Sequence, residues 1–228
     1  MKKTTFVALL LLSNQCVADT LGDALQSIES EWAAIYYKTP KAQQGEAYQK
    51  LLNKTTVLEK EHPNAAEPIV WEAVIKATYA DHQDAMSALS LVNEAKDLLH
   101  KAININPQAM DGSAYVTLGT LYYMVPKWPV AFGDEDKAKA LLETALKINP
   151  KGIDSNYYYG NFLLSLDRTE EAKKYFEYAA NAPTRPEQTF ADDQLKAEAQ
   201  KALKKIKQTT SDSDDNVFAS FNHTVQVH

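Results

Sequence analysis

The sequence predicts an all-α solenoid of about four helical hairpins followed by a C-terminal capping helix. Three segments align without gaps: AKDLLHKAININP at 95–107, AKALLETALKINP at 138–150 and AKKYFEYAANAPT at 172–184. In each segment, the apolar residues at offsets 0, 4 and 7 fall on one stripe of a helix. A proline at offset 12 ends the first two helices, and Thr184 takes its place in the third. This spacing is typical of the second helix of a tetratricopeptide (TPR) repeat, so we expect a TPR-type array.

Glycines mark the first helix of two of these repeats. Gly160 lies twelve residues before Ala172, the usual separation, whereas Gly119 lies nineteen residues before Ala138. A small residue at this point lets the two helices of a hairpin touch. The seven additional residues therefore place an insertion, MVPKWPVAFGDED at 124–136, between the two helices of one repeat. Insertions in such arrays gather on one face, often the binding face.

The helices outside these repeats follow from apolar spacing. The first hairpin is degenerate, as terminal repeats usually are. The last helix carries one apolar stripe with lysines elsewhere, which is typical of a cap that is apolar inside and solvated outside. The stripe consists of Leu195, Ala199, Ala202 and Ile206. The additional helices are expected at 21–37, at 46–61, from Pro68 to near His82, and at 191–207.

Two residues are expected to cap helices. Asp134 precedes Glu135 and Asp136, and this acidic run predicts the start of the helix after the insertion. Thr169 is followed by two glutamates, so we expect it to cap the second helix of the last repeat.

The predicted domain organisation has three parts: a signal peptide at 1–18, a TPR-like helical domain at 19–207 and a disordered acidic and polar tail at 208–228. The run TTSDSDD in the tail is solvated in character. The final NVFASFNHTVQVH alternates apolar and polar residues as a strand would, but one strand alone has nothing to pair with. The alternative to a disordered tail is that this segment pairs as an added strand with a partner protein.

The N-terminus has the features of a bacterial-type export signal, which predicts a periplasmic protein. Lys2 and Lys3 precede a seven-residue apolar core that is too short to span a membrane, and Cys16-Val17-Ala18 offers small residues for cleavage. Lipid anchoring at Cys16 is disfavoured, although not excluded, because Gln15 is bulky where a small side chain is needed.

The charge balance of the mature chain argues against two classes of partner. Removal of residues 1–18 takes away two lysines and no acids, so 24 − 2 = 22 basic residues face 30 acidic ones and the net charge becomes −8. Such an acidic protein is a poor candidate for binding nucleic acid or an anionic membrane. No later segment is long and apolar enough to insert into a bilayer.

Three stretches resemble a group of exported TPR proteins of Gram-negative bacteria. They are LYYMVPKWPVAFGD, INPKGIDSNYYYG and APTRPEQTFADD, within a resemblance that covers about residues 65–206. The group is related to the T-component of TRAP transporters (TatT-like proteins). The resemblance implies a periplasmic protein that associates with a substrate-binding component and helps deliver or store a small solute of apolar character. Many such proteins are lipid-anchored, and the weak lipidation site of this chain departs from that.

The first helices of TPR repeats line a concave groove, so inward positions can be assigned from the two glycines. The lining is mixed, with apolar, hydroxyl and amide groups, and it lacks the lysines and arginines with which some TPR domains clamp a peptide carboxylate. It suits a partly apolar ligand or an extended segment of a partner. The inward positions are Ser113, Val116, Thr120, Tyr123, Met124, Asp154, Tyr157, Asn161, Leu164 and Ser165.

The aromatic residues of the insertion have two interpretations. Trp128 and Phe132 are expected either to lie buried against the adjoining helices, as a long ordered loop requires, or to form a lid over the groove. The predicted ligand- or partner-binding residues are therefore Thr120, Tyr123, Met124, Trp128, Phe132, Tyr157, Asn161 and Leu164.

The sequence predicts no enzyme, no cofactor and no metal site. It has no nucleophile elbow and no phosphate-binding glycine loop. Asp81, His82 and Asp84 lack a second histidine at helical spacing, so they are interpreted as a surface cluster.

The first functional hypothesis is a periplasmic adaptor that binds a protein partner, with a TRAP-type solute-binding protein as one candidate, through its groove and the 124–136 loop. The alternative is a carrier of a partly apolar small molecule in a tyrosine-lined cavity.

Overall fold

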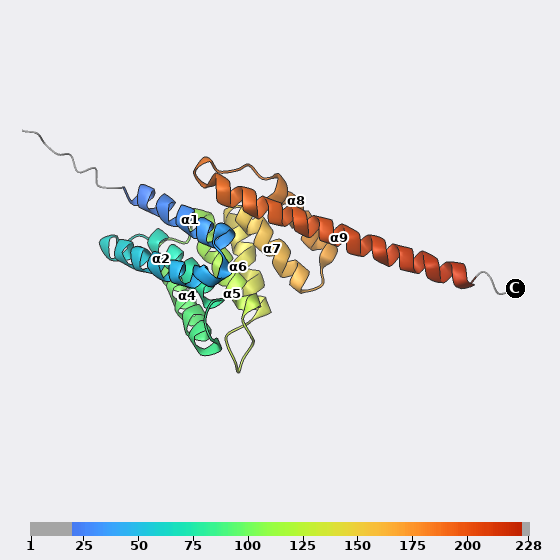
Figure 1. Cartoon of the computed structure of the whole chain (residues 1–228), viewed down its shortest axis with the longest axis horizontal. Coiled ribbons are helices and arrows are strands. Elements are labelled where there is room, and N and C mark those ends of the chain that lie inside the picture. Colours follow the sequence, from blue (N-terminus) through green and yellow to red (C-terminus); the bar gives the residue numbers. More distant parts are fainter. Residues whose placement is uncertain (1–19, 225–228) are drawn as a thin grey trace, which may run out of the picture.

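Four antiparallel helix pairs follow one another along the chain, and a ninth helix packs against the last pair (Figure 1). The computed structural model describes the backbone of residues 20–224 and the side chains of residues 20–208. The predicted signal peptide and Cys16 lie outside this part. The pairs are α1 (Leu21–Lys38) with α2 (Lys41–Glu61), α3 (Glu67–Ala80) with α4 (Ala85–Ile105), α5 (Ser113–Met124) with α6 (Glu135–Ile148), and α7 (Ile153–Ser165) with α8 (Thr169–Asn181); α9 spans Thr189–Thr224. Two short 3₁₀ turns, η1 (Ala109–Gly112) and η2 (Pro186–Gln188), precede α5 and α9.

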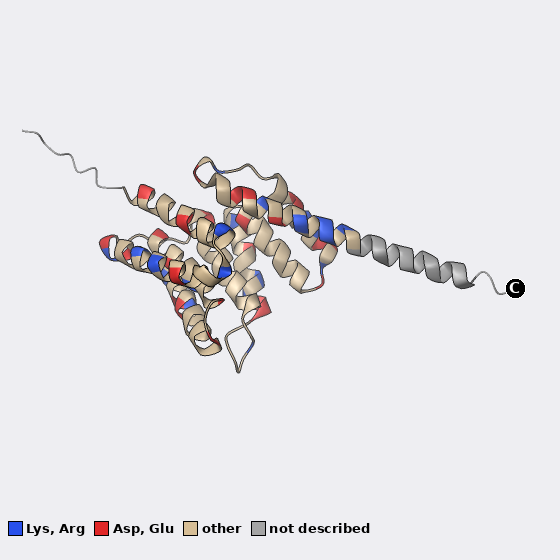
Figure 2. Ribbon diagram, viewed as in Figure 1, with Lys and Arg blue, Asp and Glu red and all other residues tan. Residues whose placement is uncertain are grey.

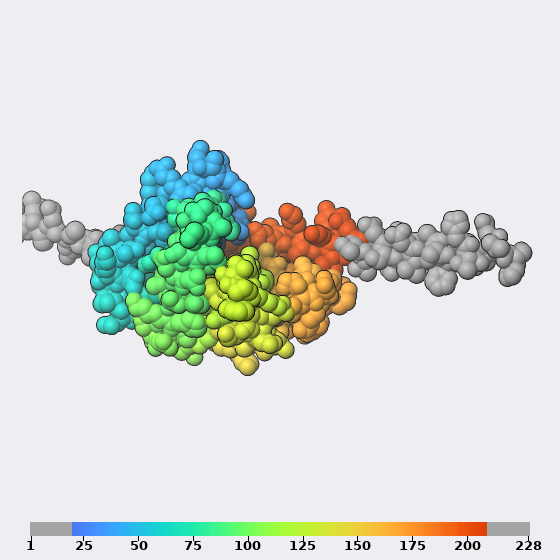
Figure 3. Space-filling view, turned by 90° about the horizontal axis from the view of Figure 1, so that it is seen from below, coloured from blue at the N-terminus to red at the C-terminus, as the bar shows by residue number. Residues whose placement is uncertain are grey.

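The predicted all-α solenoid is confirmed, and the part of the chain that is described contains no strand. Figure 3 shows the helix pairs succeeding one another across the surface in sequence order, from cyan through green and yellow to orange. None of the helices within residues 20–224 has the length and apolarity needed to cross a membrane.

The repeated stripe forms the centre of the core. All nine of its residues have no exposed surface, which is why the alanines at offsets 0 and 7 recur: a larger side chain would separate the helices. These residues are Ala95, Leu99, Ala102, Ala138, Leu142, Ala145, Ala172, Phe176 and Ala179.

Gly119 allows α5 and α6 to approach closely, as its spacing predicts. A Cβ at this position would lie 2.7 Å from Cγ of Leu142 and 3.2 Å from the carbonyl oxygen of Ala138. Gly119→Ala should therefore lower the free energy of unfolding by about 1 kcal/mol, because overpacking outweighs the gain in helix propensity. Gly45→Ala, where a Cβ meets only ordinary contacts at 3.7 and 3.8 Å, should raise it by about 0.5–1 kcal/mol. Urea denaturation of both variants measures this, and equal effects would contradict it.

The two predicted helix caps have different outcomes. The carboxylate of Asp134 accepts a hydrogen bond from the backbone N–H of Lys137 at 3.0 Å, so this cap is confirmed. The prediction for Thr169 is wrong: it is the first residue of α8, and Arg168 occupies the cap position without a side-chain cap bond. The Arg168 guanidinium instead donates two hydrogen bonds to Glu171, at 2.7 and 2.6 Å, which tie the cap residue to the first turn.

The two ends of the array meet, which the sequence did not predict. Helix α1 packs against both η2 and α9. The ring of Tyr37 in α1 meets Phe190 in α9 edge to face, with 6.0 Å between centroids, and Nζ of Lys38 lies 3.7 Å from the centre of the Phe190 ring. The Gln26 amide donates to the carbonyl oxygen of Glu187 at 3.5 Å. This N- to C-terminal seam closes one side of the concave face.

Helix α9 buries most of the predicted apolar stripe and exposes most of its lysines. Leu195, Ala199 and Ile206 are buried, whereas Lys201 and Lys204 are exposed, and Figure 2 shows basic residues gathered on this part of the helix. Because α9 continues to Thr224, the expected end of the capping helix at residue 207 lies within it. The disordered tail expected at 208–228 stays a prediction.

Candidate functional site: an aromatic, acidic groove

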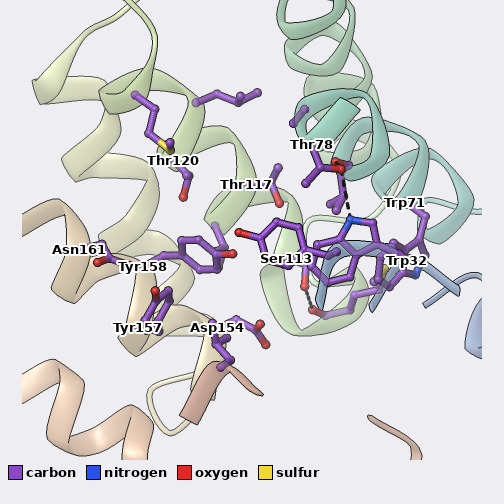
Figure 4. Close-up of a pocket in the computed structure, with 18 of the residues that line it drawn as sticks. Trp32, Trp71, Thr78, Ser113, Thr117, Thr120, Asp154, Tyr157, Tyr158 and Asn161 are labelled. Atoms are coloured by element: carbon purple, nitrogen blue, oxygen red, sulfur yellow. Dashed lines mark hydrogen bonds between the residues drawn. The ribbon is translucent and has the colours of Figure 1, made fainter. Parts of the chain in front are cut away.

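A groove of about 1280 Å³ occupies the concave face. Its walls come from α1, α3, α4, α5, α7 and α9, so residues far apart in the sequence face a common space (Figure 4). All ten positions that the repeat register assigned to the groove line it, including Tyr123, Tyr157 and Asn161. The register of a TPR helix is thus sufficient to identify this wall.

Six of the eight predicted binding residues line the groove: Thr120, Tyr123, Met124, Tyr157, Asn161 and Leu164. Trp128 and Phe132 do not belong to the lining. Phe132 is packed, since its ring lies 5.3 Å from that of Tyr122 and Nζ of Lys96 lies 4.8 Å from its centre. Trp128 is 85% exposed, so the expectation of a buried Trp128 is wrong. One aromatic anchors the loop, and the other is presented to solvent.

The 124–136 loop is a narrow hairpin that projects beyond the ends of α5 and α6 (Figure 1). Its base is fixed by two backbone bonds: the N–H of Gly133 donates to Pro126 at 2.9 Å, and that of Asp134 donates to Tyr122 at 2.8 Å. A Cβ at Gly133 would collide with the carbonyl groups of Val125 and Pro126, which explains the glycine. The loop therefore leaves the ends of α5 and α6 from a fixed base.

One wall of the groove is an aromatic cluster from α1 and α3. The Trp32 ring stacks on Tyr36 with centroids 5.3 Å apart, and it lies 5.9 Å from Trp71. Its indole N–H donates to the hydroxyl of Thr78 at 3.2 Å, which fixes the ring orientation (Figure 4). The apolar spacing that predicts the helix at 21–37 did not assign Trp32 to the groove.

The facing wall carries tyrosines from α7. The rings of Tyr157 and Tyr158 meet edge to face at 5.2 Å, and the Tyr157 hydroxyl donates to Glu198 of α9 at 2.8 Å. Burial raises the pKa of both tyrosines, and Glu198 adds to this for Tyr157. Burial alone raises the pKa of Tyr123 to about 12. These hydroxyls are therefore neutral at physiological pH and can donate and accept hydrogen bonds.

The floor near the seam is an ionic cluster centred on Arg185. Its guanidinium pairs with Asp154 of α7 at 2.9 Å and with Asp192 of α9 at 2.5 Å. Asp192, which is only 1% exposed, also accepts the backbone N–H of Arg185 at 2.7 Å. No sequence pattern singled out this arginine as a site residue, although it stands in the unusual stretch APTRPEQTF.

Glu29 of α1 completes this cluster. Burial raises its pKa to about 7, with the carboxylates of Asp154 and Asp192 contributing, while Arg185 and a hydrogen bond from Gln188 oppose the shift. Burial also raises the pKa of Asp154, against the attraction of Arg185. The cluster thus holds more carboxylates than one guanidinium can neutralise.

The described lining of the groove is strongly acidic overall. Eight carboxylates face one guanidinium there: Glu29, Glu67, Asp81, Asp111, Asp154, Glu187, Asp192 and Glu198 against Arg185. Within residues 20–208, no three His, Cys, Asp or Glu side chains are arranged to hold a metal ion. The hydroxyl oxygen of Thr120 is buried at the groove without a hydrogen-bond partner in this part of the chain.

Comparison with known proteins bears on the fold. A family model described as tetratricopeptide repeat matches residues 130–187, which include α6, α7 and α8. The crystal structure of a thermophilic TPR protein of Thermus thermophilus is similar at 19% identity and a TM-score of 0.53, over 80% of this chain and 92% of that one. No curated protein matches the chain. The repeat match and the structural similarity together support a tetratricopeptide-repeat protein with an all-α solenoid fold.

Proposed function

We propose that this protein is a non-enzymatic adaptor that binds a protein partner through the 124–136 loop at the mouth of the groove. The proposal rests on the different environments of the two aromatic residues in the loop. Phe132 is packed against Tyr122, whereas Trp128 is 85% exposed. Val130 and Met124, beside it, are 62% and 67% exposed. Exposed tryptophans on rigid supports are the usual anchors of protein interfaces.

The partner and the compartment are proposed from the sequence. The N-terminal segment has the features of an export signal, and the resemblance to T-components points to a TRAP-type solute-binding protein in the periplasm. The TPR fold supports an adaptor role in general, because stacked hairpins expose extended concave surfaces for recognition. Trp128, Val130 and Met124 are the residues with which the partner makes contact.

A second candidate is a carrier of a partly apolar solute. The specific observation that favours it is the seam between α1 and α9, which turns an open concave face into a pocket of about 1280 Å³. That volume exceeds what a small ligand requires. The two functions are compatible, since the loop projects from the rim while the solute occupies the interior.

The adaptor function predicts a position-specific crosslink in the native periplasm. A photoreactive benzoylphenylalanine at position 128 should capture a TRAP-type solute-binding protein, whereas the same residue at Met86, which is 82% exposed on α4, should not. With the purified partner, Trp128→Ala should weaken binding about tenfold or more, because a central tryptophan commonly supplies a large share of interface energy.

Met86→Ala is the matched control, since it removes an equally exposed apolar side chain outside the loop. Neither variant should change the unfolding midpoint appreciably, because neither residue is in the core. Equal capture at 128 and 86, or unchanged binding by Trp128→Ala, would overturn the adaptor proposal.

A further inference from the structure

We propose that the groove binds a small organic cation with an apolar body, such as an alkyl-substituted amine. This inference deepens the second candidate function, solute binding in the groove, and it does not depend on the loop contact. It rests on three features of the described lining: facing aromatic walls, an excess of carboxylates, and a set of apolar side chains.

The aromatic walls place five rings around one space. Trp32, Tyr36 and Trp71 form one connected cluster, with centroid distances of 5.3 and 5.9 Å from Trp32. Tyr157 and Tyr158 lie on the facing helix, and all five rings line the same groove. The negative face of an aromatic ring attracts a cation within about 6 Å, most strongly when water is excluded.

The charged groups of the groove favour a positively charged ligand. The guanidinium of Arg185 is already engaged by Asp154 and Asp192, so it offers little to an incoming anion. Glu198 is held at the aromatic wall by the hydroxyl of Tyr157, 2.8 Å away, and lines the groove. A carboxylate beside tyrosine rings is suited to a bulky ammonium group, whereas a carboxylate ligand would be repelled.

The electrostatics of the cluster around Arg185 also favour a cationic ligand. The pKa of Glu29 is raised to about 7 by burial and by neighbouring acids, so this site disfavours any further negative charge. A bound cation would favour the ionised forms of these carboxyl groups and release protons as it binds.

Part of the groove lining is apolar. Val92 of α4 and Val116 and Leu121 of α5 belong to its lining, together with Val74 and Ala77 of α3. Thr117 and Thr120 of α5 also belong to the lining (Figure 4). A ligand with a cationic head and a short alkyl body matches this lining, with the head near Tyr36 and Glu198 and the body against these apolar side chains.

The test uses three probes with one alkyl chain and different heads: hexyltrimethylammonium, hexan-1-ol and hexanoate. Isothermal titration against the folded mature chain should give a dissociation constant at least about tenfold lower for the ammonium probe than for the other two. Glu198→Gln should weaken the ammonium probe about fivefold, because the amide keeps an acceptor for Tyr157 but loses the charge. Glu177→Gln, an exposed glutamate on α8 outside the groove, is the control.

Tyr36 allows a second test. It is 45% exposed, so its replacement should not unfold the protein. Tyr36→Leu should weaken ammonium binding more than Tyr36→Phe, because only the latter keeps an aromatic face. Retained circular dichroism in both variants shows that the fold is intact.

Each outcome decides something. Tighter binding of hexanol or hexanoate, or equal effects of Glu198→Gln and Glu177→Gln, would overturn the cation inference while leaving a solute carrier in place. If none of the three probes binds, both the cation inference and the solute-carrier function are overturned. The adaptor function would then depend only on the crosslinking result. A short lysine-containing peptide that binds more tightly than the ammonium probe would assign the cation to a partner's side chain and overturn the small-molecule form.

Discussion

Arg185→Met is expected to lower the free energy of unfolding by about 3 kcal/mol. The guanidinium is the cation that neutralises Asp192, whose side chain is only 1% exposed, and it also pairs with Asp154. Methionine keeps much of the packing of the arginine stem but leaves a buried carboxylate with the backbone N–H of residue 185 as its remaining partner at this point. Removal of one partner from a buried ion pair costs far more than the pair contributes relative to apolar replacements.

Arg168→Met is the matched control. Arg168 also makes a bidentate contact with a carboxylate, that of Glu171, but both side chains are substantially exposed. Exposed pairs are worth about 0–1 kcal/mol, so this variant should remain close to the unsubstituted protein. Urea denaturation at neutral pH measures both. A loss of less than about 1 kcal/mol for Arg185→Met would show that Asp192 finds other compensation and that the cluster does not hold the seam together.

The fold was largely predictable from local sequence because each TPR hairpin repeats the same contacts. The stripe at Ala138, Leu142 and Ala145 identifies a buried helix face without knowledge of its neighbours, and all three residues are fully buried. Gly119 and Gly160 then fix the register of the preceding helices, and the register assigned the groove positions on α5 and α7 correctly. Contacts that recur in every repeat require the same residue types at a fixed spacing, so they can be recognised in the sequence.

The rest of the site depends on how the small rotations between hairpins accumulate. Trp32 faces the groove that Arg185 and Glu198 also line because α1 returns to pack against η2 and α9. No local pattern encodes that meeting, since it depends on the summed twist of four repeats. The prediction of a buried Trp128 was wrong for a different reason. Trp128 and Phe132 are both large aromatic residues in the same loop, and only the three-dimensional path of the hairpin decides which of them packs.

Stability should fall as the pH rises from about 4.5 to about 7, and Glu29→Gln should remove the part of that fall that Glu29 contributes. The folded-state pKa of Glu29 is about 7, against an ordinary value of 4.5, so the folded protein binds this proton more tightly than the unfolded chain does. Between these values the unfolded state carries fewer protons at this site, and the free energy of unfolding decreases with pH. The expected contribution is about 3 kcal/mol, fully expressed above pH 7.

The comparison of two variants isolates this carboxyl from the others in the chain. Because glutamine resembles the protonated acid, Glu29→Gln should match the unsubstituted protein near pH 4.5 and exceed its stability by about 3 kcal/mol at about pH 7.5. Glu61→Gln, at an exposed position near the end of α2, should follow the unsubstituted protein within about 0.5 kcal/mol at both pH values. The groups that face Glu29 are Arg185, Asp154, Asp192 and Gln188. An equal gain in the free energy of unfolding at both pH values would mean that glutamine merely makes better hydrogen bonds with these groups. A gain confined to the higher pH would instead identify an ionised Glu29 as the group that weakens the seam, and the closure of the groove would then depend on its protonation.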